Sequence, residues 1–226
     1  MAMIHLEPQT LEMFSRALDG LKPPPNLSLS QWADKYRKLS AEASASQGQS
    51  NTDAAPFQRE IMDAIGDVHI RKVVAMMCAQ AGKTEGLILN TIGFYMSYHP
   101  ASIMVMQPTV NLGESFSKDR LTPMLRDTPA LRGLVNTKSR YSGNTISKKN
   151  FPGGMLVIVG ANAPTDLRSR PIKVLLADEV DAYKASAGKE GDPVMLAEER
   201  QTTFWDYKTV MVSTPTTKAA SRILDE

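Results

Sequence analysis

The feature that most constrains the fold of this chain is a short loop at residues 78–84, with the sequence Cys-Ala-Gln-Ala-Gly-Lys-Thr. An apolar run precedes the loop, and a segment with helical spacing follows it. A strand, a tight loop that ends in Gly-Lys-Thr and a helix form the context that a phosphate-binding loop requires, because backbone N–H groups and the helix N-terminus then face anionic oxygens. In such a loop Lys83 reaches the outer phosphates, and the hydroxyl group of Thr84 ligates Mg²⁺. The residues expected to bind nucleotide here are Gln80, Ala81, Gly82, Lys83 and Thr84.

A second motif, at residues 174–179, supports the first one. It reads Val-Leu-Leu-Ala-Asp-Glu, a short apolar run that ends in two carboxylates. In ATPases with a phosphate-binding loop, a buried strand ends in an Asp that holds Mg²⁺ and a Glu that polarises the attacking water. An ordinary strand followed by a solvated acidic turn is the alternative. Because Asp178 lies 95 residues after Lys83, a spacing on the scale of one domain, we favour the ATPase. We therefore assign Mg²⁺ binding to Asp178 and catalysis to Glu179.

The composition fits a single globular domain with a small appendage. The chain has 226 residues, of which 42% are apolar, enough for a substantial core. The formal net charge of +2 permits a nucleic-acid partner but does not argue for one. The single cysteine, Cys78, excludes a disulfide framework, and we expect it to be a small buried side chain. No apolar run approaches the roughly 18–20 residues that cross a bilayer, so we expect no membrane association.

From residue 70 onward, apolar strands alternate with segments of helical periodicity. This pattern predicts an α/β fold with a mostly parallel central sheet flanked by helices, and the two motifs make it a P-loop NTPase fold of the helicase-like, ASCE type. The predicted strands are 73–79, 103–107, 155–160, 174–177 and 210–212. Residues 144–150 are expected to form a hairpin with 155–160, and a helix is expected to begin after Asn111 as its N-cap.

The rest of the chain indicates two smaller parts. Residues 1–40 form an N-terminal segment of two short helices, the second of which Ser28 or Ser30 can cap. Residues 41–56 are rich in Ala, Ser, Gln and Asn without periodicity, which predicts a flexible linker. Residues 57–226 then form the ATPase domain, which starts with a short amphipathic helix.

Two more segments have positions that suit a nucleotide site. Residues 213–216 follow the last predicted strand, where a small-hydroxyl motif can sense the γ-phosphate, although a plain turn is the alternative. We expect Ser213 and Thr214 to contact the nucleotide. Gln58 lies 25 residues before Lys83, and its amide can bind the edge of adenine. A helix start that exposes Gln58 to solvent is equally compatible with the pattern.

Two clusters of basic residues remain. Arg168 and Arg170 lie just before the strand that ends at Asp178, and we predict that they neutralise charge on the transferred phosphoryl group, within one subunit or from a neighbour. A solvated loop or a salt bridge is the alternative. The segment 132–150 contains five basic residues and no acidic residue. Such a segment can follow DNA phosphates, and a solvated basic hairpin fits equally well.

Together these segments resemble the N-terminal ATPase domain of the large terminase subunit of tailed phages, of the lambda type. The matching stretches cover most of residues 28–220, in order, although each is short. They are residues 57–62, 79–85, 107–109, 117–121, 166–171, 177–181 and 213–216. The first glycine of the loop is commonly substituted in this family, in agreement with Met77. An Arg often stands at the position of Ala79, so another arginine would supply that charge here.

The resemblance implies an ATP-driven motor that moves double-stranded DNA into a procapsid in the cytoplasm of an infected bacterium. It implies ATP and Mg²⁺ as cofactors, with phosphate on Lys83 and Mg²⁺ on Thr84 and Asp178. It further implies that Glu179 activates water, that Gln58 contacts adenine and that residues 213–216 couple hydrolysis to movement. The implied partners are double-stranded DNA, the small terminase subunit, the portal protein and further copies of the chain in a ring.

The resemblance also sets limits and leaves alternatives. The family has a C-terminal nuclease domain, and because this chain ends at Glu226 we expect that domain to be absent and no DNA cleavage by the chain alone. A different helicase-like DNA translocase would have the same motifs. A third hypothesis is an assembly module that binds nucleotide or DNA without turnover of its own.

Overall fold

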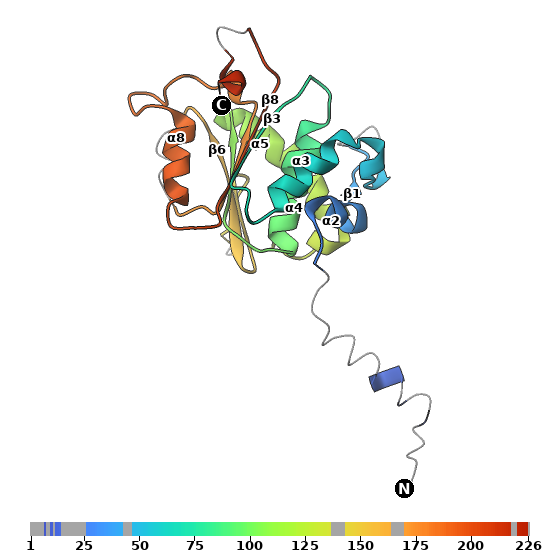
Figure 1. The fold of residues 1–226 in the computed structure, drawn as a ribbon. Helices are drawn as coiled ribbons and strands as arrows, with labels where there is room; N and C mark the ends of the chain where they lie inside the picture. The colour runs from blue at the N-terminus through green and yellow to red at the C-terminus, as the bar shows by residue number, and fades with distance from the viewer. Residues whose placement is uncertain are drawn as a thin grey trace.

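The protein, seen here in a computed structural model, is built around one central β-sheet (Figure 1). The structure describes residues 7, 10, 12–14, 26–42, 47–136, 143–163, 170–217 and 221–225. The sheet has six strands in the order β3-β8-β7-β4-β6-β5. They are β3 (Lys72–Met76), β4 (Ile103–Gln107), β5 (Lys148–Phe151), β6 (Gly154–Gly160), β7 (Val174–Asp178) and β8 (Lys208–Ser213). All neighbouring strands are parallel except β5 and β6, which form the expected hairpin. The prediction of a mostly parallel α/β fold is therefore confirmed.

Helices cover both faces of the sheet, because side chains along the central strands alternate between two apolar clusters. In β4, Ile103 and Val105 belong to one cluster, whereas Met104 and Met106 belong to the other. The first face, on the right in Figure 1, carries α2 (Leu29–Tyr36), α3 (Phe57–Gly66), η2 (Lys83–Leu89), α4 (Asn90–Ser97), α5 (Val110–Phe116), η3 (Ser117–Leu121), α6 (Thr122–Asp127) and η4 (Pro129–Leu131). The second face carries α8 (Pro193–Glu198) with the short helical turns η5 (Val180–Ala182), η6 (Glu199–Gln201) and η7 (Arg222–Leu224).

The helix α2 is integrated into the core of the first face. Ser28 caps it in a reciprocal capping box with Gln31, which settles the choice between the two candidate caps. The Trp32 ring lies directly against Gly93 of α4, where an added Cβ would stand 2.2 Å from the ring. Trp32 is 1% exposed, and its indole N–H donates to the Ser97 hydroxyl group at 3.2 Å. This N-terminal helix is therefore part of the same packed body as the sheet.

The segment 41–56, expected to be a linker, has regular structure in its described part. β2 (Gly48–Gln49) pairs with β1 (Lys38–Leu39), and η1 (Thr52–Ala54) follows. The carboxylate of Asp34 on α2 accepts hydrogen bonds from the backbone N–H and the hydroxyl group of Thr52, both at 2.7 Å. Side-chain hydrogen bonds hold such short elements, and they leave no hydrophobic periodicity for a sequence pattern to detect.

Three local expectations differ from the structure. The N-cap of α5 is Thr109, whose hydroxyl accepts from the backbone N–H of Leu112, and not Asn111. β3 ends at Met76, so the residues after it already belong to the loop. Cys78 lies in that loop and is exposed, contrary to the expectation of a buried side chain. Within the part of the chain that the structure describes, no helix is long and apolar enough to cross a membrane.

Candidate functional site

The loop between β3 and η2 has the backbone shape expected of a phosphate cradle. Gly82 lies in the left-handed region at φ 75°, where a side chain would add strain, and Gln80 adopts φ 63° despite its side chain. The first hydrogen bond of η2 runs from the backbone N–H of Gly86 to the carbonyl of Gly82 at 2.7 Å. The helix therefore starts immediately after the turn, and its free N–H groups face the loop.

Lys83 connects three segments of the site. Its side chain is only 6% exposed, and its ammonium group donates to the carbonyl of Cys78 at 3.4 Å. It also donates to the hydroxyl group of Thr214 after β8, and it lies 3.4 Å from a carboxylate oxygen of Glu179 after β7. One cation thus joins the carboxyl ends of β3, β7 and β8, because parallel strands end at the same edge of the sheet.

Asp178 is a buried carboxylate with one satisfied oxygen. It is 4% exposed, and its Oδ2 accepts from the Gln107 amide at 3.0 Å and from the Thr84 hydroxyl at 3.5 Å. Its Oδ1 is buried and has no hydrogen-bond partner among the described residues. Burial raises the pKa of Asp178, and the Gln107 hydrogen bond opposes that rise. A buried carboxylate oxygen without a partner, beside a threonine hydroxyl, fits the oxygen ligands that Mg²⁺ prefers.

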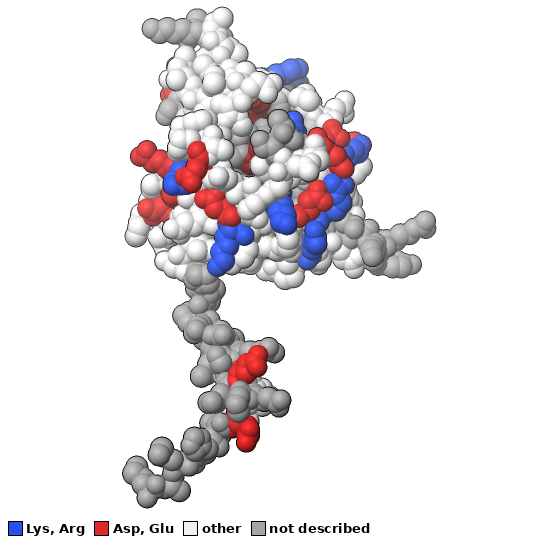
Figure 2. Space-filling view, turned by 90° about the vertical axis from the view of Figure 1, so that its right-hand side faces the viewer, with Lys and Arg blue, Asp and Glu red and all other residues white. Residues whose placement is uncertain are grey.

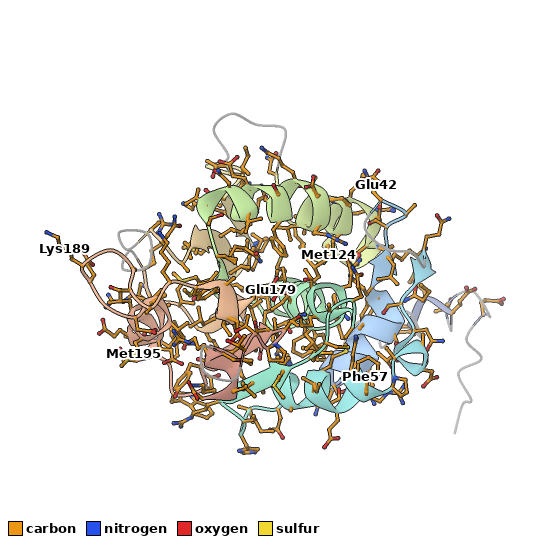
Figure 3. All side chains as sticks on the ribbon, turned by 90° about the horizontal axis from the view of Figure 1, so that it is seen from above. Glu42, Phe57, Met124, Glu179, Lys189 and Met195 are labelled. Carbon is orange, nitrogen blue, oxygen red and sulfur yellow. The ribbon has the colours of Figure 1, made fainter. Side chains whose placement is uncertain are left out.

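Glu179 points its carboxylate across the carboxyl edge of the sheet. Seen from above in Figure 3, it lies near the middle of the molecule, between α3 with Phe57 and α8 with Met195. Its backbone adopts φ 54° and ψ 52°, a left-handed conformation that costs a non-glycine residue about 1 kcal/mol. The side chain is 43% exposed, and one oxygen accepts from the backbone N–H of Thr214 at 3.4 Å. A strained conformation that is kept in this position favours a functional role.

The two hydroxyl residues at the end of β8 differ in their surroundings. Ser213 is fully buried, where its hydroxyl accepts from the backbone N–H of Asp181 at 3.2 Å, so it supports the turn after β7. Thr214 instead contacts Lys83 and Glu179, as described above. The Asp181 carboxylate also accepts from the backbone N–H groups of Thr216 and Ile223, both at 2.8 Å. The segment after β8 is thereby attached to the turn that carries Glu179.

Gln58 lies against the loop and is not directed into solvent. It is 8% exposed, and its amide nitrogen donates to the carbonyl of Ala81 at 2.6 Å. Gly86 leaves the space for it, because a Cβ there would be 1.9 Å from the Gln58 oxygen. The interpretation in which the helix start exposes Gln58 to solvent is therefore wrong. The neighbouring Phe57 is the exposed residue, at 57%. Both residues line a cavity of about 400 Å³, which is also lined by the loop residues 80–82 and by residues 50–52, 54 and 55.

The two candidate arginines are not brought into this site by the described structure. Arg168 falls outside the described residues. Arg170 contacts the sulfur of Met155 at 3.4 Å. Met155 lies at the beginning of β6, about 16 Å along the strand from the carboxyl edge where Lys83 and Glu179 lie. A role for Arg170 within its own subunit would need a large movement, so action on a neighbouring subunit stays a prediction.

The basic segment 132–150 is only partly described. Lys138 and Arg140 lie outside the described residues. Lys149 is 8% exposed, and its ammonium group donates to the carbonyls of Thr145 and Ile146, so it stabilises the hairpin internally. On the face that carries α2 and α3, Lys and Arg side chains are mixed with Asp and Glu side chains (Figure 2). The described part of that face is therefore not a uniformly basic surface of the kind that DNA phosphates favour.

Several residues of the site were not identified from the sequence. Gln107 is a polar residue at the end of an otherwise apolar strand, and that position beside Asp178 was a detectable signal. Glu85 follows Thr84 and pairs with Arg37, 48 positions earlier in the chain, at 2.9 Å. Arg120 lies 3.5 Å from the other oxygen of Glu85. No local pattern shows such long-range ion pairs.

The fold defines a class of protein, an α/β domain of the P-loop type, and polar side chains gather at the carboxyl edge of its sheet. The family model of the phage terminase large subunit gpA, ATPase domain, matches residues 44–226. The chain belongs to this family.

Individual relatives agree with this assignment. The large terminase subunit of Enterobacteria phage P21 is 30% identical over 203 residues, and that of Escherichia phage lambda is 28% identical over 205 residues. These matches cover 88% and 89% of this chain but 31% of each relative, so the chain spans about a third of their length. Among solved structures, the large terminase of bacteriophage HK97 superimposes with a TM-score of 0.67 at 15% identity. That match covers 88% of this chain and 39% of the HK97 protein, and it supports the fold.

Proposed function

We propose that this chain hydrolyses ATP at the carboxyl edge of its sheet. The observation that carries the proposal is the meeting of three strand ends: Lys83 comes after β3, Asp178 ends β7 and Glu179 follows it, and Thr214 comes after β8 and contacts both Lys83 and Glu179. The phosphate loop, a buried carboxylate with a free oxygen and a second, more exposed carboxylate are the parts that phosphoryl transfer to water requires. The family description as an ATPase domain supports the same reaction.

Each group has a distinct part in the proposed reaction. The loop N–H groups and Lys83 bind the phosphates, and Thr84 and Asp178 provide the ligands for Mg²⁺. Mg²⁺, when bound, supplies positive charge to the phosphate oxygens. Glu179 orients a water molecule and accepts its proton, while the water oxygen bonds to the γ-phosphorus and the bond to the bridging oxygen of ADP breaks. The products are ADP and inorganic phosphate.

The Gln58 side chain would act mainly on the loop. Because its amide nitrogen already donates to the carbonyl of Ala81, we propose that Gln58 fixes the loop beside the base. The cavity of about 400 Å³ next to it extends from the loop to exposed Phe57, and an adenine ring fits an aromatic rim of this kind. We also propose that the second N–H of the Gln58 side-chain amide donates to adenine.

We further propose that hydrolysis drives double-stranded DNA into a procapsid. The support is the membership of the terminase family and the similarity to the P21 and lambda large subunits. The implied partners are the small terminase subunit, the portal protein and further copies of the chain, in the cytoplasm of the infected bacterium. Within the site, Thr214 contacts the phosphate-binding lysine, and Thr216 of the same segment is bound to Asp181. Changes at the nucleotide can therefore be transmitted to the chain after β8.

The substitution Glu179→Gln tests the hydrolysis proposal. It keeps the shape of the side chain but removes the base, so ATP should still bind while phosphate release falls by at least about 100-fold. Glu60→Gln, an exposed carboxylate on α3, is the matched control and should keep the wild-type rate. An unchanged rate in Glu179→Gln would show that Glu179 is not the base.

The alternatives are separated by DNA assays on the same chain. A packaging motor should displace a third strand from a blunt duplex without opening the duplex, whereas a helicase-like translocase should unwind a forked substrate. An assembly module would bind nucleotide yet release no phosphate, even with the small subunit and the portal present.

A further inference from the structure

The helical turn η3 carries an arginine to the rim of the proposed hydrolysis site. Arg120 is 44% exposed, and its guanidinium lies 3.5 Å from a carboxylate oxygen of Glu85. Glu85 is the residue after Thr84 and is 18% exposed. The arginine is thus held next to the proposed Mg²⁺ ligand, by an acidic side chain of the phosphate-loop helix itself.

Arg120 also lines a cavity of about 300 Å³ together with Thr84, Asp178 and Glu179. This is the space in which the γ-phosphate and the attacking water would lie, because it is bounded by the proposed metal ligands and the proposed base. Of the described side chains that line it, Arg120 is the one cation, against three carboxylates including Asp119. A phosphate with its several negative charges would be favoured there by an arginine.

The second partner of Glu85 makes a movement of Arg120 feasible. Arg37 is 1% exposed, and its guanidinium lies 2.9 Å from the other carboxylate oxygen of Glu85. It is fixed by further hydrogen bonds to the carbonyl of Lys38 and to the hydroxyl group of Thr128. Glu85 would therefore remain paired with a buried cation if Arg120 left it. A partly exposed ion pair such as the one between Arg120 and Glu85 contributes little to stability. Arg120 can therefore exchange the Glu85 carboxylate for a phosphate oxygen at little cost in free energy.

We propose that Arg120 acts as a catalytic arginine within its own subunit: Glu85 positions it, and its guanidinium donates to the γ-phosphate of ATP during hydrolysis. This inference rests on the proposed ATPase function and adds a residue to it. The planar guanidinium of Arg120 would bind two phosphate oxygens and offset the charge that develops on the transferred group, with no covalent bond to the arginine. Arg37 serves as a positioning residue, since it keeps Glu85 in place.

The experiment compares Arg120→Ala and Arg120→Lys with the control Arg126→Ala. Arg126 is also an exposed arginine on this helical segment, but it pairs with Glu42 and Asp127, away from the cavity. For each chain we would measure kcat and KM for ATP with Mg²⁺, and the affinities for ADP and for a non-hydrolysable ATP analogue. Thermal unfolding reports whether each variant is folded.

The proposal predicts that Arg120→Ala lowers kcat by about 100-fold or more, since arginines that contact the transferred phosphoryl group contribute about 10³–10⁵-fold. The affinity for the ATP analogue should fall, whereas the affinity for ADP should stay within about twofold, because ADP lacks the γ-phosphate. Arg120→Lys keeps an ion pair with Glu85 but loses the two-point contact, so it should remain clearly impaired.

Other results would overturn the proposal in recognisable ways. Equal losses of ADP and ATP-analogue affinity, or full activity in Arg120→Lys, would mean that Arg120 only supports Glu85 and the fold. If the wild-type chain hydrolyses ATP in a Lys83-dependent manner and Arg120→Ala is as active as Arg126→Ala, this inference alone fails. If hydrolysis does not depend on Lys83, the proposed function fails first.

Discussion

The substitution Gly86→Ala tests whether Gln58 and the phosphate-loop helix are packed as the structure shows. An added Cβ would lie 1.9 Å from the oxygen and 2.6 Å from the amide carbon of Gln58, so the Gln58 side chain must leave its place. That movement breaks the hydrogen bond to Ala81, with a net loss of about 0.5–1.5 kcal/mol. Crowding of a packed site adds about 1–3 kcal/mol. Alanine in a helix recovers about 0.5–1 kcal/mol relative to glycine.

The expected net effect is a loss of roughly 0.5–4 kcal/mol in the free energy of unfolding. For a chain of this length, that corresponds to a fall in Tm of roughly 1–16 °C, measured by circular dichroism during heating. The effect of Gly86→Ala on the free energy of unfolding should change sign once the Gln58 side chain is removed. In a Gln58→Ala background, Gly86→Ala should be neutral or stabilise the protein by up to about 1 kcal/mol, because only the helical preference remains.

A double-mutant cycle of the two substitutions gives the decisive number. The contact between Gln58 and Gly86 predicts a coupling between the two positions of at least about 1 kcal/mol. The same loss of stability from Gly86→Ala in both backgrounds would refute the reasoning, since Gln58 would then not be the group that fills the space beside Gly86.

Two further predictions concern the metal ligand and the N-terminal helix. Gln107→Leu removes the hydrogen bond that opposes the raised pKa of the buried Asp178, so that pKa should rise further. A protonated carboxyl group does not bind metal, so the Mg²⁺ concentration for half-maximal ATP hydrolysis should be higher in the variant, and the difference should grow as the pH falls. The same Mg²⁺ dependence in both chains at all pH values would contradict this prediction. Trp32→Ala should lower the free energy of unfolding by about 3–5 kcal/mol and Tm by roughly 6–20 °C, because Trp32 is buried. Trp32 lies before residues 44–226, which the family model matches, so the result tests whether α2 belongs to the same core. Trp205→Ala, at a side chain that is 71% exposed, is the control and should change stability by less than about 0.5 kcal/mol; equal shifts would mean that α2 is not part of the core.

The sequence was informative where one local pattern determines one local structure. The strands Ile103–Gln107 and Val174–Asp178 are buried along their whole length, and each begins with four consecutive apolar residues, a pattern that is typical of a central strand in a parallel sheet. The hairpin of β5 and β6 was also found, because its turn residues stand between two suitable runs. The Gly-Lys-Thr loop and the Asp-Glu pair were located by their position at strand ends.

The sequence was uninformative where distant residues decide the outcome. The cap of α5 was placed two residues late, because Thr109 and Asn111 have similar propensities and only the backbone shows which hydroxyl or amide accepts the bond. The inward position of Gln58 depends on the space above Gly86, which no spacing reveals. The ion pairs of Glu85 join residues that lie 48 and 35 positions away in the chain. Such contacts follow from the packing of whole elements.

The most direct test of the central claim is Mg²⁺-dependent ATP hydrolysis by this chain beside Lys83→Ala, with and without double-stranded DNA. Lys83 is buried where three strand ends meet, so its loss should remove the phosphate-binding cation while the sheet remains folded. We predict phosphate release by the wild-type chain and a fall of at least about 100-fold in the variant, with an unchanged circular dichroism spectrum. Equal phosphate release by the two folded chains, including none from either, would contradict the proposed role of Lys83 in ATP hydrolysis.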